Sequence, residues 1–286
     1  MNLSMTGALA AAYQSGSQRA RIVTESWGES NLYCPNCSSP KLTWLEPGHP
    51  ASDYSCPACG FWYQLKSQKS PIGDSITDGA YAAMMNAIHH DEMPSLYFMQ
   101  YELPAWRVKN LLLVPSFAFP PSAIVKRKPL SPRARRHGWV GCNFNLSRIP
   151  ADARIGVVTE SQISPAAEVR EQFKRVKPLK DIGVKERGWT LDVLNVVRRL
   201  CEVGTVGSAV RAPSGRNFPA ALPPVTSQRD VPTNTFTTAD AYIFTRELER
   251  LHPDNRHVKD KIRQQLQVLR DAGLLLHVGR GVWRLP

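Results

Sequence analysis

Four cysteines in two closely spaced pairs constrain this chain more than any other feature. Cys34 and Cys37 form one pair, Cys56 and Cys59 form the other, and eighteen residues separate the pairs. Two intervening residues let both thiolates of a tight turn face one ion, and two such turns complete a tetrahedron. The spacing predicts a Zn²⁺ site. Four thiolates leave no coordination position for a substrate, so this zinc is expected to be structural.

The composition is that of a globular protein with a polyanionic partner. The 286 residues are 42% hydrophobic and 21% charged, and Lys and Arg exceed Asp and Glu by a formal net charge of +12. This excess favours nucleic acid as the partner. No apolar run approaches the roughly 20 residues that span a bilayer. We therefore expect a cytoplasmic protein in which the cysteines stay reduced.

A second set of residues, with a pattern typical of metal-dependent catalysis, lies before and after the second cysteine pair. Asp53 lies three residues before Cys56, and Gln64-Leu65-Lys66 begins five residues after Cys59. Along a strand, Gln64 and Lys66 project to the same face. An Asp followed by Gln-x-Lys fits the pattern D…(D/E)xK of metal-dependent nucleases. In that pattern, oxygen ligands hold Mg²⁺ on a phosphodiester and the lysine stabilises the developing charge.

Gln64 departs from this pattern, because it carries an amide where an acid is expected. The amide oxygen can ligate a metal ion but brings no negative charge, so the affinity for Mg²⁺ should fall. The alternative interpretation makes Gln64 an ordinary sheet residue and Lys66 a surface cation.

Periodicity predicts a mixed α/β domain over residues 1–182. A helix is expected over 15–31, with Ser17 as its N-cap and Glu25 either within reach of a metal or solvated. A second helix, rich in Ala and Met, follows Asp78 as a possible cap. These helices should pack against one mixed sheet. We expect its strands at 53–56, 60–67, 95–101, 110–119, 139–146 and 154–159, and a further helix at 168–176.

The second predicted domain, residues 183–286, has the element order of a winged helix. An amphipathic helix over 189–203 precedes a stretch at 203–235 that is rich in Gly, Pro, Ser and Thr, which we interpret as a flexible insertion. Thr237 or Thr238 should cap the next helix, and Gly273 should close the last helix before a hairpin. That last helix would lie in the major groove of DNA, with the hairpin as the wing.

Two stretches carry side chains suited to DNA. A proline-interrupted basic loop ends at Trp139, whose ring can stack on or wedge beside a base. The alternative is a solvated basic loop before a core tryptophan. In the last helix, Arg suits guanine edges and Gln suits adenine edges. The candidate DNA-binding residues are Arg135, Arg136, Trp139, Lys259, Arg263, Gln264, Gln267 and Arg280.

Several stretches, spread over nearly the whole chain apart from 203–235, form a specific combination. They are SQRARIVTESW, LYCPNC, SDYSCPACG followed by QLKSQK, DGAYAAMM, RKPLSPRARRHGWVGCN, RGWTLDVLN, and IRQQLQVLRD followed by GRGVWR. In these stretches the chain resembles the DpnI family of restriction endonucleases. The resemblance implies a PD-(D/E)xK nuclease domain with an inserted cysteine zinc site, then a C-terminal winged helix. It also implies a bacterial or archaeal monomer that cuts double-stranded DNA at GATC sites containing N6-methyladenine.

The resemblance assigns roles to the residues singled out above. Asp53 and Gln64 match the ligands of a catalytic Mg²⁺, Leu65 would contribute its backbone carbonyl, and Lys66 matches the catalytic lysine. Trp139 matches an aromatic residue placed near the methylated adenine. The family pattern has Glu at the position of Gln64, and the insertion at 203–235 lengthens the winged helix.

The sequence thus predicts a type II methyl-directed restriction endonuclease with a catalytic Mg²⁺ and a structural Zn²⁺. A rival from another class is a methyl-DNA-binding protein whose site is weakened or inactive because of Gln64. A third candidate is a winged-helix transcription regulator, which accounts for the C-terminal domain but leaves Asp53 and Lys66 without a role.

Overall fold

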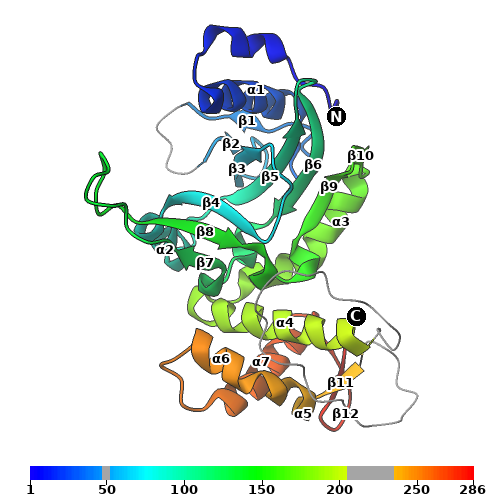
Figure 1. The fold of residues 1–286 in the computed structure, drawn as a ribbon. Helices are drawn as coiled ribbons and strands as arrows, with labels where there is room; N and C mark the ends of the chain where they lie inside the picture. Colours follow the sequence, from blue (N-terminus) through cyan, green and yellow to red (C-terminus); the bar gives the residue numbers. More distant parts are fainter. Residues whose placement is uncertain (47–51, 205–234) are drawn as a thin grey trace. The chain divides into compact units, whose positions relative to one another are not determined.

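The computed structural model describes residues 1–46, 52–204 and 235–286 (Figure 1). The chain forms two compact units, Met1–Asp192 and Val193–Pro286. The division falls inside α4 (Val184–Gly204), later than the boundary at residue 182 expected from the sequence. Within the described residues, no helix combines the length and the hydropathy that a membrane crossing requires.

A seven-stranded mixed sheet forms the core of the first unit, in the order β1-β2-β3-β5-β6-β9-β10. Its only parallel pair in the described residues is β3 and β5, where Lys66 lies opposite Phe98. A parallel pair requires a crossover, and residues 69–94 supply it. The strands are β1 (Thr43–Trp44), β2 (Tyr54–Ser55), β3 (Trp62–Gln68), β5 (Ser95–Glu102), β6 (Arg107–Val114), β9 (Ile155–Thr159) and β10 (Gln162–Ile163).

A second, antiparallel sheet has the order β4-β8-β7. Its strands are β4 (Ser75–Ala80), β7 (Ile124–Lys126) and β8 (Gly141–Asn145). The prediction that the strand at 139–146 joins the main sheet is therefore wrong, because apolar alternation indicates a strand without indicating its partner. Buried Phe144 of β8 packs edge-on against Phe98 of β5, with ring centroids 5.7 Å apart. Part of the hydrophobic core therefore lies between the two sheets.

The prediction that Asp78 caps a helix is also wrong. Asp78 lies on β4, and α2 (Tyr81–His89) begins only after that strand, with Ala80 as its N-cap. Pairing of β4 with β8 fixes this segment as extended backbone. Tertiary pairing thus overrides the local preference of Asp for helix N-caps.

Helix α1 (Gly16–Asn31) covers one face of the main sheet. Val23 and Trp27 are buried there, and the hydroxyls of Thr24 and Ser67 lie 3.1 Å apart, which joins α1 to β3. The N-cap of α1 is Ser15, two residues before the cap expected at Ser17. Helix α3 (Ala166–Val176) packs against β9 and buries Val169.

The second unit is a winged helix. Its sheet has the order β11-β13-β12, and its last helix, α7, is closed by Gly273 with a φ of +73°. Thr237 caps α5 through a capping box with Asp240, as expected, whereas β11 was not foreseen. The flexible insertion predicted at 203–235 lies almost entirely outside the described residues. The elements are β11 (Thr235–Thr237), α5 (Thr238–Ala241), α6 (Thr245–Leu251), α7 (Val258–Asp271), β12 (Leu276–Gly279) and β13 (Val282–Arg284).

Short 3₁₀ segments complete the described structure. They are Gly7–Ala12, Ser116–Ala118, Pro121–Ala123, Leu146–Arg148, Ala151–Ala153, Lys177–Asp181 and Tyr242–Phe244.

Candidate active site and zinc centre

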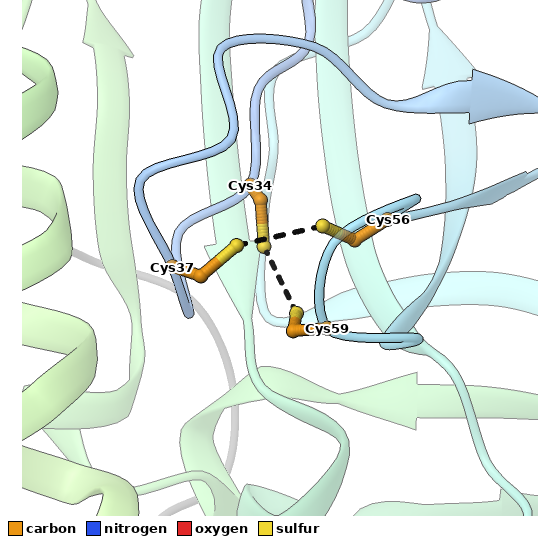
Figure 2. A group of neighbouring side chains, drawn as sticks. All are labelled: Cys34, Cys37, Cys56 and Cys59. Atoms are coloured by element: carbon orange, nitrogen blue, oxygen red, sulfur yellow. Dashed lines mark hydrogen bonds between the residues drawn. The ribbon is translucent and has the colours of Figure 1, made fainter.

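The four predicted zinc ligands meet in one cluster, which Figure 2 shows as two loops with converging thiols. All four sulfur atoms lie within 4.8 Å of one another. Cys34 and Cys59 are 3.6 Å apart, and Cys37 and Cys56 are 3.5 Å apart. These separations suit four thiolates around a single ion, and the residues therefore fit a tetrahedral zinc site.

The pKa shifts of the cluster thiols differ in direction, since burial raises the pKa of Cys34 and of Cys37. Burial raises the pKa of Cys56, but backbone N–H groups of Cys59 and Ala58 outweigh it and lower that pKa to about 6. Outside the cluster, Arg170 donates hydrogen bonds to the carbonyl oxygens of Cys34 and Ser39, at 3.1 Å each. The first cysteine turn is thus tied to α3 independently of any metal.

Asp53 stands at the open edge of β3. In the described residues, strand β2 pairs with β3 only through Tyr54 and Ser55, so no described strand residue pairs with the Leu65 backbone on that side. Asp53 takes that place, since its Oδ2 accepts a hydrogen bond from the Leu65 N–H at 2.8 Å. The N–H and C=O of a strand residue point toward the same neighbouring strand. The Leu65 carbonyl is therefore directed to the same side as the Asp53 carboxylate.

The Asp53 carboxyl lies in a partly buried setting. Burial raises its pKa, whereas the Leu65 N–H and the charges of Lys66 and Arg21 act to lower it. Arg21 also pairs with Glu25 at 2.7 Å. The Glu25 side chain is only 17% exposed, so it is not the fully solvated residue of the second of the two interpretations given for it above. Burial raises the pKa of Glu25, and the Arg21 pair opposes that rise.

Gln64 and Lys66 project from the face of β3 opposite to the one that carries Ser67 and α1. The Oε1 atom of Gln64 is buried and has no hydrogen-bond partner among the described residues. A buried amide oxygen without a partner costs free energy, and a hard cation would satisfy it. The oxygen atoms of Asp53, Gln64 and Leu65 are the donor type that Mg²⁺ requires, so the residues present fit this ion.

Lys66 does not project freely into solvent. Its ammonium contacts the carboxylate of Asp78 on β4, and the Asp78 side chain is only 2% exposed. Sequence reasoning missed Asp78 as a site residue, because the segment was interpreted as the start of a helix. Only the pairing of β4 with β8 brings it to Lys66.

The basic loop between β7 and β8 projects from the smaller sheet (Figure 1). Arg135 and Arg136 are exposed, and the Arg136 guanidinium lies 5.2 Å from the centre of the Trp139 ring. Trp139 is half-buried and packs over Gly141, where an added Cβ would lie 2.8 Å from the ring. Trp139 therefore combines a fixed backbone position with a partly accessible ring, as a base-stacking residue requires.

In the second unit, α7 presents one polar face and one buried face. Its buried residues include Gln265, Leu266 and Leu269. Arg280 is exposed in the turn between β12 and β13. The structure thus gathers the candidate DNA-binding residues of this unit on α7 and the wing turn. The exposed candidates on α7 are Lys259, Arg263, Gln264 and Gln267.

Comparison with known protein families covers both units. Residues 1–182 match the DpnI family, described as the Dam-replacing family, and residues 228–285 match DpnI_C, described as the Dam-replacing HTH domain. The first match spans more than half of the 286 residues. The second match accounts for α6 and α7 and implies DNA binding. The chain therefore belongs to the DpnI, or Dam-replacing, family of methyl-directed restriction endonucleases.

Proposed function

We propose that this protein hydrolyses phosphodiester bonds of double-stranded DNA at GATC sites that contain N6-methyladenine, and that it requires Mg²⁺. Family membership supports a methyl-directed nuclease. The observation that carries the proposal furthest is the buried Oε1 of Gln64, which lacks a partner in the described residues. Gln64 belongs to the same hairpin as Asp53, and it lies on the same face of β3 as Lys66.

In this proposal each residue of the β2–β3 hairpin has a distinct task. Asp53 and Gln64 would hold the Mg²⁺, and the Leu65 carbonyl would complete the protein ligands. The Leu65 N–H orients the Asp53 carboxylate through the 2.8 Å hydrogen bond. When bound, the Mg²⁺ neutralises charge on the scissile phosphate and promotes attack by water. Lys66 stabilises the negative charge that develops on the phosphate, and a 5′-phosphate is left.

Methyl recognition is proposed for the loop that carries Trp139. A methyl group in the groove adds apolar surface. An aromatic side chain that fits against the methyl group gains binding free energy by burying this surface. Arg135 and Arg136 are exposed beside it and can bind phosphates. The winged helix would add a second reader through α7 and Arg280, because its exposed Arg and Gln side chains suit base edges.

One observation favours a second candidate, a methyl-DNA-binding protein without cleavage. Gln64 is neutral, so Asp53 is the only carboxylate among the three proposed magnesium ligands. A site with one charged ligand should bind Mg²⁺ weakly. Gln64→Glu separates the two candidates. In a weak nuclease it lowers the Mg²⁺ concentration needed for cleavage, whereas in a protein that has lost cleavage for other reasons it leaves the DNA intact.

The proposal is tested with one plasmid prepared from an adenine-methylating host and from a non-methylating host. Each is incubated with protein and Mg²⁺, with a chelator control. Discrete fragments from the methylated plasmid alone support the proposal, and Lys66→Met should slow cleavage about 100-fold or more. Lys41→Met, a change at an exposed lysine, is the matched control. Intact DNA in every reaction, with a gel shift on methylated DNA, would establish the second candidate instead.

A further inference from the structure

The contact between Lys66 and Asp78 places a second charged residue beside the proposed active site. Lys66 comes from the main sheet, with 26% of its side chain exposed, and Asp78 comes from the smaller sheet, with 2% exposed. One Asp78 oxygen, Oδ1, contacts the ammonium, whereas Oδ2 is buried without a hydrogen-bond partner in the described parts of the chain. Among the described side chains, Lys66 is therefore the hydrogen-bond and ion-pair partner of Asp78.

Strand β4 is irregular at the position of this contact. Thr77 pairs with Asn143 and Ala80 pairs with Gly141, so that Asp78 and Gly79 together face Cys142 alone. Two residues opposite one form a β-bulge, a device that turns a side chain away from its regular direction. The bulge lies where β4 supplies the carboxylate to Lys66.

Stability alone does not account for a buried carboxylate at this position. Removing a charge from water is costly, and apolar residues of similar volume often stabilise a protein as well as a buried ion pair does. The Oδ2 atom of the Asp78 carboxylate also lacks a hydrogen-bond partner among the described residues. A lysine on a flexible four-carbon stem, by contrast, needs a fixed partner to occupy one position.

We propose, on the basis of the function proposed above, that Asp78 is a positioning residue that holds the Lys66 ammonium at the metal-binding edge of β3. Asp78 acts through Lys66 and does not touch the DNA or the metal ion. Misplacing a reacting group by about 1 Å costs roughly 100-fold in rate. Loss of Asp78 should therefore lower kcat by about 10- to 100-fold and leave KM for methylated DNA unchanged.

The test is a double-mutant cycle in single-turnover cleavage of methylated plasmid. Asp78→Asn should slow the wild-type protein about 10- to 100-fold but should not slow Lys66→Met any further. It should also leave the Mg²⁺ dependence unchanged. Asp74→Asn, at an exposed acid just before β4, is the matched control and should cleave at the wild-type rate. If Asp78→Asn fails to shift methylated DNA in a gel, Asp78→Ser replaces it in the cycle.

Three results would overturn the inference while the proposed nuclease stands. One is cleavage at the wild-type rate by Asp78→Asn when Lys66→Met is slowed. The second is an equal slowing by Asp78→Asn in the wild-type and Lys66→Met backgrounds, and the third is a higher Mg²⁺ requirement of Asp78→Asn. Each of the last two would show an action of Asp78 that is independent of Lys66. Absence of cleavage by the wild-type protein with Mg²⁺ overturns the proposed function, and the inference with it.

Discussion

Gly28, in the last turn of α1, provides a direct test of how tightly this helix packs against Tyr54. A Cβ added there would overlap the Tyr54 hydroxyl, lie 2.8 Å from Tyr54 Cζ and lie 3.3 Å from Leu32 Cδ1. Tyr54 is fully buried, and its hydroxyl donates a hydrogen bond to the Glu25 carbonyl at 2.8 Å. The Gly28→Ala substitution must therefore displace a core side chain that directly follows Asp53.

Two effects of Gly28→Ala oppose each other, and their magnitudes decide the sign. Alanine in a helix interior is favoured over glycine by up to about 1 kcal/mol. Overpacking a rigid core costs about 1–3 kcal/mol, and loss of the buried Tyr54 hydrogen bond costs about 1–3 kcal/mol more. We expect Gly28→Ala to lower the free energy of unfolding by about 1–5 kcal/mol, or ~2–4 °C in Tm for each kcal/mol.

Urea denaturation compares Gly28→Ala with Gly16→Ala, a control in the same helix. An added Cβ at Gly16 meets no atom within 4 Å, so the control should be as stable as the wild type or slightly more stable. Tyr54→Phe should restore part of the stability in the Gly28→Ala background, because it removes the overlapping hydroxyl. A Gly28→Ala protein as stable as the control would refute this reasoning.

The remaining predictions concern the zinc centre, the basic loop and a buried tyrosine. The purified protein should release one Zn²⁺ per chain to a chromogenic chelator. Cys56→Ser should lower both the zinc content and Tm. A metal-free protein whose Tm is unaffected by Cys56→Ser would contradict the proposed zinc site. Trp139→Ala should weaken binding of methylated DNA by about 1–3 kcal/mol in a gel shift, whereas Trp44→Ala, on the short strand β1, should leave it unchanged. Burial raises the pKa of Tyr33 from 10.0 to about 12, so the folded state holds this proton more tightly than the unfolded state. The free energy of unfolding should therefore fall as the pH rises from 10 toward 12, and the absorbance of tyrosinate should follow unfolding. Complete ionisation of the tyrosines at pH 10 in the folded protein would exclude the raised pKa of Tyr33.

The part of the structure that sequence could predict is the part built from local spacing. The two Cys-x-x-Cys pairs bring their thiols together through tight turns, and all four sulfurs meet as the spacing requires. That Gln64 and Lys66 lie on the same face of β3 likewise follows from the alternation of side chains along a strand. The family matches agree with the resemblance that these motifs carry.

Long-range pairing set the limit of prediction. Nothing in the residues around Asp78 indicates β8 as a partner, and the Ala- and Met-rich sequence that follows favours a helix. The same limit explains why two sheets were interpreted as one, since the pattern around Phe144 predicts a strand in either. Strand β11 was missed because three residues are too few for a periodic signal, and Thr237 within it is recognised more easily as a helix cap.

The turn that carries Cys56 and Cys59 bears on the strand register of the β2–β3 hairpin. Cys56 and Cys59 form its tip, and Tyr54 pairs with Tyr63 just below them. Side chains alternate along a strand, so a slip of one residue would exchange the face of Gln64 for that of its neighbour. A Zn²⁺ ion bound by the cysteines at the tip would therefore fix the strand register at the other end of the hairpin. Oxidation of the cysteines, or loss of a bound metal ion, would then misalign the proposed catalytic residues even while the surrounding sheet stays folded.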